Sequence, residues 1–232
     1  MGSGKCSLIC LLSLLICLQL SFAGCTSSES SVPDNGAATP SGATITATAT
    51  MPATATETAT THAPVRWQAD GAISAGEYPD FLEAAGGKFS VFWKTDSENL
   101  YMALKGEVQG WVAVGFDPSD DMKDADIILG GMQDGDLLIY DMYSTGKYGP
   151  HPPDADLGGS YDILESGGSE AGGVTVIEFS RKLDTGDRYD NALQNGDEVV
   201  AIWSMANSDD PDLKHNVGKG SLNLMLSMGA AS

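Results

Sequence analysis

Hydrophobic residues between positions 65 and 232 come in short runs separated by glycine and polar residues. Some runs alternate apolar and polar side chains with a period of two, others are apolar throughout, and no window keeps the 3.6-residue period of an amphipathic helix. The intervening segments are rich in Gly, Asp and Asn, which favour tight turns. The strands that we expect are 89–94, 100–105, 110–116, 126–132, 136–143, 173–180, 198–205 and 221–226.

This spacing predicts an all-β fold, an antiparallel immunoglobulin-like β-sandwich, because about eight short strands at such intervals pack readily as two sheets. Residues 96–99 and 133–135 have the composition of turns that join neighbouring strands as hairpins. The run 110–116 is apolar at nearly every position, which indicates a strand that is covered on both faces.

The first 24 residues follow a different pattern. Lys5 precedes a long apolar stretch that ends in small residues, which is typical of a secretory signal. Residues 22–25, Phe-Ala-Gly-Cys, resemble the lipobox of bacterial and archaeal lipoproteins, whose cysteine is lipidated and becomes the new N-terminus. We therefore expect residues 1–24 to be a lipoprotein signal peptide and Cys25 to carry the lipid; an uncleaved membrane anchor and an ordinary signal are the alternatives.

Residues 25–64 consist mostly of Thr, Ala, Ser and Pro. Such a segment cannot bury enough apolar surface to offset its chain entropy, so it is predicted to be a disordered tether, and its composition also suits O-linked sugar. The folded domain is then 65–232. We expect it to be extracytoplasmic, held by the lipid to a prokaryotic cell membrane or to the cell surface.

Charge and cysteine content narrow the possible functions. The chain has 12 Lys+Arg against 32 Asp+Glu, a net charge of -20, which argues against binding nucleic acid. All 4 cysteines lie within the first 25 positions, so the domain has no thiolate metal site and no covalent haem attachment. It also lacks a Ser-His-Asp triad, H-E-x-x-H and a phosphate loop, so we expect no enzyme.

Three stretches of the domain match one family in order. Residues 110–130 read Gly-Trp-Val-Ala-Val-Gly-Phe, then a polar loop with Met, then Ala-Asp at the start of the next strand. Residues 179–187 read Phe-Ser-Arg-Lys-Leu-Asp-Thr-Gly-Asp, and 214–224 carry His-x-x-Gly before a last strand. Together they resemble the DOMON domain. The family includes haem b cytochromes, such as the cytochrome domain of cellobiose dehydrogenase, and haem-free modules that bind sugars or other ligands.

The resemblance implies the ligands of a non-covalent haem b. The haem-binding members use an axial Met and an axial His, and the matching positions here are Met122 and His215. Such a haem needs two donors on opposite faces and an apolar slot between them, and both residue types are established axial ligands. Because both axial positions would be filled, one-electron transfer is favoured over oxygen chemistry.

The haem pocket is expected to have an apolar wall and a positively charged edge. The large apolar candidates for the wall, each equally well explained as sandwich core, are Trp111, Phe116, Trp93 and Met132. The lysines that flank the proposed ligands and would suit the haem propionates are Lys123, Lys214 and Lys219.

The sequence thus predicts a membrane-tethered b-type cytochrome that relays single electrons between a quinone-linked membrane oxidoreductase and a partner protein. The alternative is a haem-free DOMON module that binds carbohydrate or another small ligand by stacking on tyrosines, the candidates being Tyr143, Tyr148 and Tyr161.

Two further motifs stay open. The acidic loop 117–126 is rich in oxygen ligands suited to calcium, but it lacks the central Gly and the closing Glu of an EF-hand, which favours a solvated loop. His151, in a proline-bounded loop, is the reserve axial ligand or a donor to a transition metal.

Overall fold

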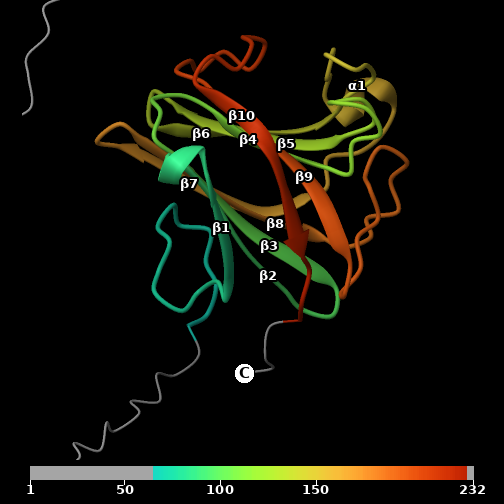
Figure 1. Cartoon of the computed structure of the whole chain (residues 1–232), viewed down its shortest axis with the longest axis horizontal. Coiled ribbons are helices and arrows are strands. Elements are labelled where there is room, and N and C mark those ends of the chain that lie inside the picture. Colours follow the sequence, from blue (N-terminus) through green and yellow to red (C-terminus); the bar gives the residue numbers. More distant parts are fainter. Residues whose placement is uncertain (1–64, 229–232) are drawn as a thin grey trace, which may run out of the picture. The chain divides into compact units, whose positions relative to one another are not determined.

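The computed structural model describes residues 65–228, and two five-stranded antiparallel sheets packed face to face make up this part of the chain (Figure 1). In order across the first sheet the strands are β1 (Asp80–Ala84), β2 (Phe89–Thr95), β3 (Asn99–Gly106), β8 (Val174–Lys182) and β7 (Ile163–Ala171). In order across the second they are β10 (Gly218–Met225), β9 (Glu198–Met205), β4 (Val112–Phe116), β5 (Asp126–Gln133) and β6 (Asp136–Tyr143). The predicted all-β sandwich is confirmed.

Helical structure within residues 65–228 is limited to a 3-10 turn, η1 (Ala85–Gly87), and one short helix, α1 (Asp154–Leu157). Neither helix has the length or the apolar composition needed to cross a membrane. The predicted signal peptide 1–24, the lipidated Cys25 and the tether 25–64 lie outside the described residues.

Two strands, β1 and β7, were not predicted from the sequence. β7 reads Ile-Leu-Glu-Ser-Gly-Gly-Ser-Glu-Ala and lies at the edge of its sheet, where exposed polar side chains hide the usual alternation. Its glycines have a packing role, because a Cβ on Gly167 would lie 1.9 Å from the carbonyl oxygen of Ala69. The segment that precedes β1 can therefore lie directly against β7.

The core fills the space between the sheets with alternate side chains of each strand. On β4 the inward-facing residues are Val112, Val114 and Phe116, all buried, and they pack in one cluster with residues of β3, β8 and β9. Stacked rings of Phe89 and Trp203, with centroids 4.7 Å apart, link β2 and β9 within this core.

A buried carboxylate holds the segment before β1 against the outer face of the first sheet. Glu178 of β8 accepts hydrogen bonds at Oε2 from the backbone N–H groups of residues 70–72, at 3.1, 2.7 and 3.2 Å. Its Oε1 accepts from the Tyr78 hydroxyl at 2.8 Å, and this hydroxyl in turn accepts from the Trp67 indole at 2.6 Å. The first sheet is thus covered on its outer face, whereas loops cover the outer face of the second.

Candidate ligand-binding cavity

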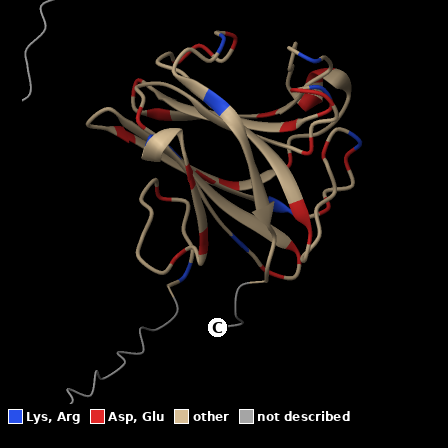
Figure 2. Cartoon of the chain, in the orientation of Figure 1, with Lys and Arg blue, Asp and Glu red and all other residues tan. Residues whose placement is uncertain are grey.

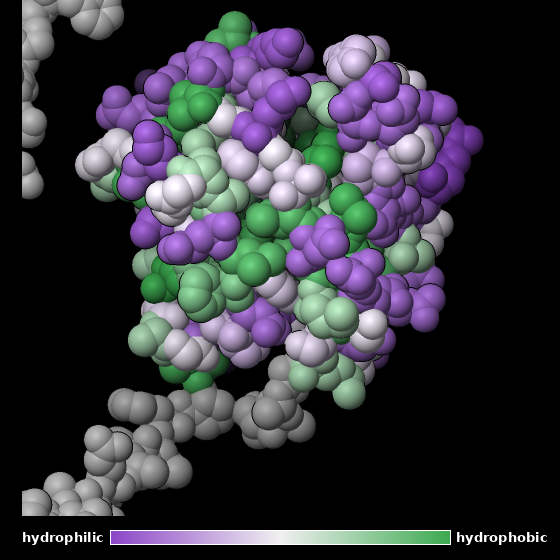
Figure 3. Space-filling model, in the orientation of Figure 1, coloured by the Kyte–Doolittle hydropathy of each residue, from purple (hydrophilic) through white to green (hydrophobic). Residues whose placement is uncertain are grey.

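A cavity of about 1110 Å³ lies on the outer face of the second sheet. Its walls are parts of the loops around 118–122, 148–156 and 211–215. The space-filling view in Figure 3 shows hydrophobic side chains at the base of a recess between the loop at the top and the loop at the upper right. Outward-facing residues of four strands form the floor, namely Ala113, Gly115, Ile127, Leu129, Tyr140, Met142, Val200 and Ile202.

The floor is apolar because β4 has hydrophobic residues on both of its faces. While Val112, Val114 and Phe116 point into the core, the alternate positions up to Gly115 face the cavity. A Cβ on Gly115 would lie 3.0 Å from the side chains of both Ile127 and Ile202, so glycine lets these floor residues close over the strand. The continuous apolar run in the sequence therefore serves the core on one side and the cavity on the other.

Met122 lies in the wall that β4 and β5 supply through their connecting loop. Its side chain is half-buried and packs on the cluster that contains Trp111 and Leu129. Its backbone is fixed from both sides, because its N–H donates to the carbonyl of Lys147 at 3.2 Å and its carbonyl accepts from Ala125 N–H at 3.1 Å. These hydrogen bonds fix the main chain of Met122, and its side chain lines the cavity.

His215 lies far from Met122 in the sequence, in the loop between β9 and β10, and lines the same cavity. Trp111 fastens this loop, because its indole N–H donates to the carbonyl of Asp210 at 3.1 Å and its backbone pairs with Ser208 and Ala206 at 3.1 and 3.0 Å. Met122, His215 and Trp111 thus all line one cavity, and their role as haem-binding residues stays a prediction.

The surroundings of His215 favour its neutral imidazole. Burial, followed by the positive charges of Lys219 and Lys214, lowers the pKa of His215 below its ordinary value. A neutral ring keeps a lone pair available for a metal ion. Lys214 and Lys219 also line the cavity. Figure 2 shows that basic segments are few and acidic segments many across the domain.

A third donor also lies in the cavity wall. His151 lines the cavity, and its Nδ1 is buried without a hydrogen-bond partner. The cavity is therefore lined by two thioethers, Met122 in the wall and Met142 on the floor, and by two imidazoles, His215 and His151. His151 comes from the proline-bounded loop that the sequence singled out as the reserve ligand.

Several predicted pocket residues lie elsewhere. Lys123 is not among the residues that line the cavity; its ammonium group lies 3.8 Å from Asp124 in the exposed part of the loop. Phe116 and Trp93 belong to the core between the sheets, because they occupy inward positions of their strands. The sulfur of Met132 instead lies where a Cβ on Gly168 would be 3.1 Å away, so it packs towards β7.

The carboxylates of the acidic loop 117–126 contact different partners and do not surround one common site. Asp120 and Asp121 pair with Lys147 at 2.9 and 3.0 Å, and Asp117 accepts a backbone hydrogen bond from Val200 at 3.0 Å. Asp126 turns into the interior. This arrangement favours the solvated loop over the calcium loop considered from the sequence.

The tyrosines proposed for carbohydrate stacking are also separated. Tyr148 lines the cavity and is 78% exposed, so it lies at the rim. Tyr143 packs on Tyr189 and donates to Asp124 at 3.1 Å, and Tyr161 is exposed away from the cavity.

The donor set and the space both fit a haem b. A thioether and an imidazole from different loops border one cavity, and its floor is apolar. Its volume of about 1110 Å³ slightly exceeds the usual range of small-molecule pockets, about 300–1,000 Å³, as a large ligand requires. Two lysines at its edge match the negative charge of haem propionates.

These features define a β-sandwich domain with a ligand cavity built on the outer face of one sheet. The model of the DOMON domain family matches residues 85–206, and the chain belongs to this family. Met122 and His151 lie within the matched residues, whereas His215 follows them.

Among curated proteins, the chain is 32% identical over 144 residues to DBH-like monooxygenase protein 1 of Mus musculus, covering 60% of this chain and 22% of that protein. It is 27% identical over 124 residues to MOXD1 homolog 2 of Drosophila melanogaster, covering 53% of this chain and 16% of that protein. The chain therefore spans about a fifth of the length of these relatives.

Two solved structures resemble the chain at low identity. The cytochrome domain of Myriococcum thermophilum cellobiose dehydrogenase has 17% identity and a TM-score of 0.47, with 62% of this chain and 77% of that chain covered. The cytochrome b domain of pyranose dehydrogenase from Coprinopsis cinerea has 16% identity and a TM-score of 0.48, with 62% and 80% covered.

Proposed function

We propose that this chain is an extracytoplasmic b-type cytochrome, tethered to the membrane through Cys25, that relays single electrons through a haem bound by Met122 and His215. The observation that carries the proposal is the convergence of these two side chains, 93 positions apart in the sequence, on one cavity with an apolar floor. When bound, the haem iron would alternate between its ferric and ferrous forms.

The residues of the chain have distinct parts in this proposal. Met122 supplies the thioether and His215 the neutral imidazole, each from a loop that backbone hydrogen bonds fix to the second sheet. Lys214 and Lys219 would pair with the propionates at the cavity edge. The apolar floor excludes water, which limits the reorganisation that accompanies a change in charge.

The partners are proposed from chemistry and location. A tether of the length of residues 25–64 would let the domain reach between a quinone-linked membrane oxidoreductase and a second redox protein. The net charge of -20 favours a partner with a basic docking surface.

Haem binding by four single variants of the full chain tests the ligand assignment. Met122→Leu and His215→Ala each remove one donor, so each is expected to lose haem or to shift its spectrum from low spin to high spin. The matched controls are Met142→Leu on the cavity floor and His151→Ala in its wall, which should keep the low-spin spectrum. If the loss of low spin follows His151 rather than His215, the ligand pair is wrong.

A second candidate function is a haem-free module that binds a carbohydrate. The exposed ring of Tyr148 at the cavity rim favours it, because a sugar could stack there over the apolar floor. Saturable binding of an oligosaccharide by protein that takes up no haem, lost in Tyr148→Ala, would establish this function instead.

A further inference from the structure

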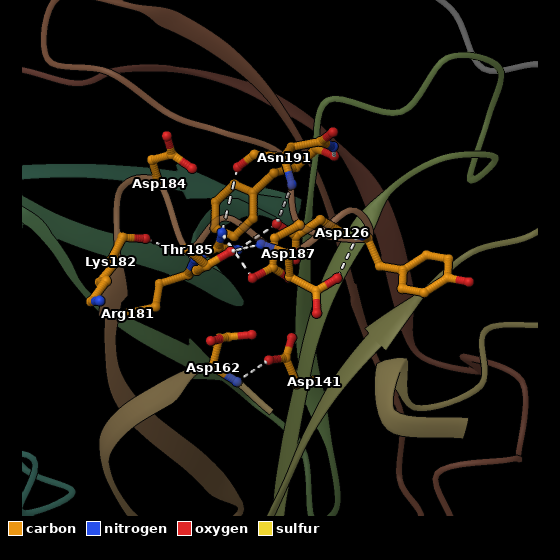
Figure 4. A network of polar contacts seen from close by, with 12 residues as sticks. Asp126, Asp141, Asp162, Arg181, Lys182, Asp184, Thr185, Asp187 and Asn191 are labelled. Atoms are coloured by element: carbon orange, nitrogen blue, oxygen red, sulfur yellow. Dashed lines mark hydrogen bonds and ion pairs between the residues drawn. The ribbon is translucent and has the colours of Figure 1, made fainter. Parts of the chain in front are cut away.

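Three aspartates, Asp126, Asp141 and Asp190, meet inside the sandwich apart from the cavity donors, and a fourth, Asp154, lies near enough for their charges to raise its pKa. Asp126 begins β5, Asp141 lies on β6, Asp154 begins α1, and Asp190 lies in the loop between β8 and β9. Asp126, Asp141 and Asp154 are at most 4% exposed, and the side chain of Asp190 is 2% exposed although its backbone is partly accessible. One carboxylate oxygen each from Asp126, Asp141 and Asp190 lie within 4.8 Å of one another, and Figure 4 shows Asp126 and Asp141 facing the same space.

A single guanidinium faces this cluster. Arg181 of β8, which is 1% exposed at its side chain, pairs with Oδ2 of Asp126 and lies 3.5 Å from Oδ2 of Asp190. Asp141 receives one hydrogen bond, from the backbone N–H of Asp162 at 2.7 Å. Four buried carboxylates therefore face one buried positive charge, which leaves the interior short of cations.

Six of the carboxylate oxygens have no hydrogen-bond partner although they are buried. They are Oδ1 of Asp126, Oδ1 of Asp141, and both oxygens of Asp154 and of Asp190. Buried polar atoms are normally paired, since a lone buried acceptor costs about 1–3 kcal/mol, and more when it is charged. Consistent with this shortage, burial raises the pKa of Asp141 to about 7 and that of Asp154 to about 8.

We infer that Asp126, Asp141, Asp154 and Asp190 form a buried binding site for calcium, which fastens α1 and the adjoining cavity wall to β6. Calcium takes six to eight oxygen ligands, and the carboxylates of Asp126, Asp141 and Asp190 lie close enough together to share one ion, with the unpaired oxygens of Asp154 beside them. Oxygens bound to one Ca²⁺ lie at most about 4.6–5.2 Å apart, and the oxygens of Asp126, Asp141 and Asp190, all within 4.8 Å of one another, meet this limit.

Calcium would act on the cavity wall through α1. Asp154 directly follows Pro152 and Pro153, which line the cavity, and the Pro152 carbonyl accepts a hydrogen bond from Tyr143 N–H at 3.1 Å. α1 itself has only four residues. An ion shared by Asp154 and Asp141 would therefore join the wall to the sheet. This inference does not depend on the proposed haem, because it uses other side chains.

Calcium titration of the chelator-treated, haem-free full chain tests the site. We expect saturable binding of one Ca²⁺, and at a calcium concentration 100-fold above the dissociation constant a rise in melting temperature of about 5–10 °C. Amide hydrogen exchange in residues 152–159 should slow on calcium addition. If calcium shifts neither the melting temperature nor the exchange, the inference is overturned.

Isosteric variants locate the ion. Asp141→Asn and Asp154→Asn should each weaken calcium binding at least about tenfold, whereas Asp136→Asn at the exposed start of β6 should not. In chelator both variants should melt at or above the wild-type temperature, because each removes a buried charge without a counter-ion, and in calcium this order should reverse. Unchanged calcium binding in both variants would place the ion elsewhere and refute the assignment.

Discussion

Replacing Arg181 with Met removes the one guanidinium that, among residues 65–228, pairs with the buried aspartates. Arg181 pairs with Asp126 and Asp190 and also donates to the carbonyl of Lys182 at 3.2 Å. Removing one partner of a buried ion pair costs about 3–5 kcal/mol, since the remaining charge stays desolvated. For a domain of this size, 1 kcal/mol shifts the melting temperature by about 2–4 °C. We therefore expect Arg181→Met to melt about 6–20 °C below the wild type.

The size of this loss should depend on pH, with a sign set by Asp126. Burial raises the pKa of Asp126 to about 6 even beside Arg181, and without the guanidinium this pKa rises further. The folded variant then holds a proton that the unfolded chain releases above about pH 4, so its stability falls as pH rises. The destabilisation should be larger at pH 8 than at pH 5.

Urea denaturation and calorimetry in chelator at both pH values measure the effect. The matched control is Arg188→Met, because Arg188 is exposed and its guanidinium donates to the Leu157 carbonyl and the Tyr189 hydroxyl and lies over the Tyr189 ring, all near the surface. The control should change the free energy of unfolding by less than about 1 kcal/mol. A loss below about 1 kcal/mol for Arg181→Met at pH 8 would refute the reasoning about uncompensated charge.

Gly110→Ala should lower the free energy of unfolding by about 1–3 kcal/mol and weaken haem binding. Gly110 has φ +143°, and a Cβ there would lie 2.3 Å from the backbone of the loop that leads to His215. Wild-type stability of this variant in urea would contradict the prediction. Glu178→Gln should lower the free energy of unfolding by about 2 kcal/mol, because the amide cannot accept all the hydrogen bonds that the carboxylate accepts. An unchanged melting temperature would contradict this prediction. In chelator the melting temperature of the wild type should fall as pH rises from 5 to 8. Burial raises the folded-state pKa of Asp141 to about 7 and of Asp154 to about 8, above the unfolded value, so the folded state binds protons that the unfolded chain has already released. Calcium should make the melting temperature depend less on pH. A melting temperature that rises over this range in chelator would show that the sign is wrong.

Local pattern was enough to predict the sandwich and eight of its ten strands, all except β1 and β7. The apolar run 110–116 indicated cover on both faces, and β4 is buried throughout. β7 was not predicted because it is a polar edge strand, and its glycines allow close contact with residues far away in the sequence. Lys123 was placed in the pocket because it follows Met122, but neighbouring loop residues point in different directions, and Lys123 faces Asp124.

The buried acidic cluster was beyond sequence reasoning because its members come from four separate elements. In a chain with 32 Asp+Glu, each aspartate resembles the many solvated ones. One signal was available: Asp141 interrupts the apolar strand 136–143 at an inward position, next to the outward Met142. A charged residue at such a position requires a partner in the interior, but the sequence does not show which residues provide it.

The absorbance spectrum of the full chain, purified with a supply of haem and then reduced with dithionite, tests the central claim most directly. If Met122 and His215 both bind the haem iron, the reduced protein should show the sharp bands of a low-spin b-type haem. A folded, colourless protein that takes up no haem on reconstitution would contradict the account.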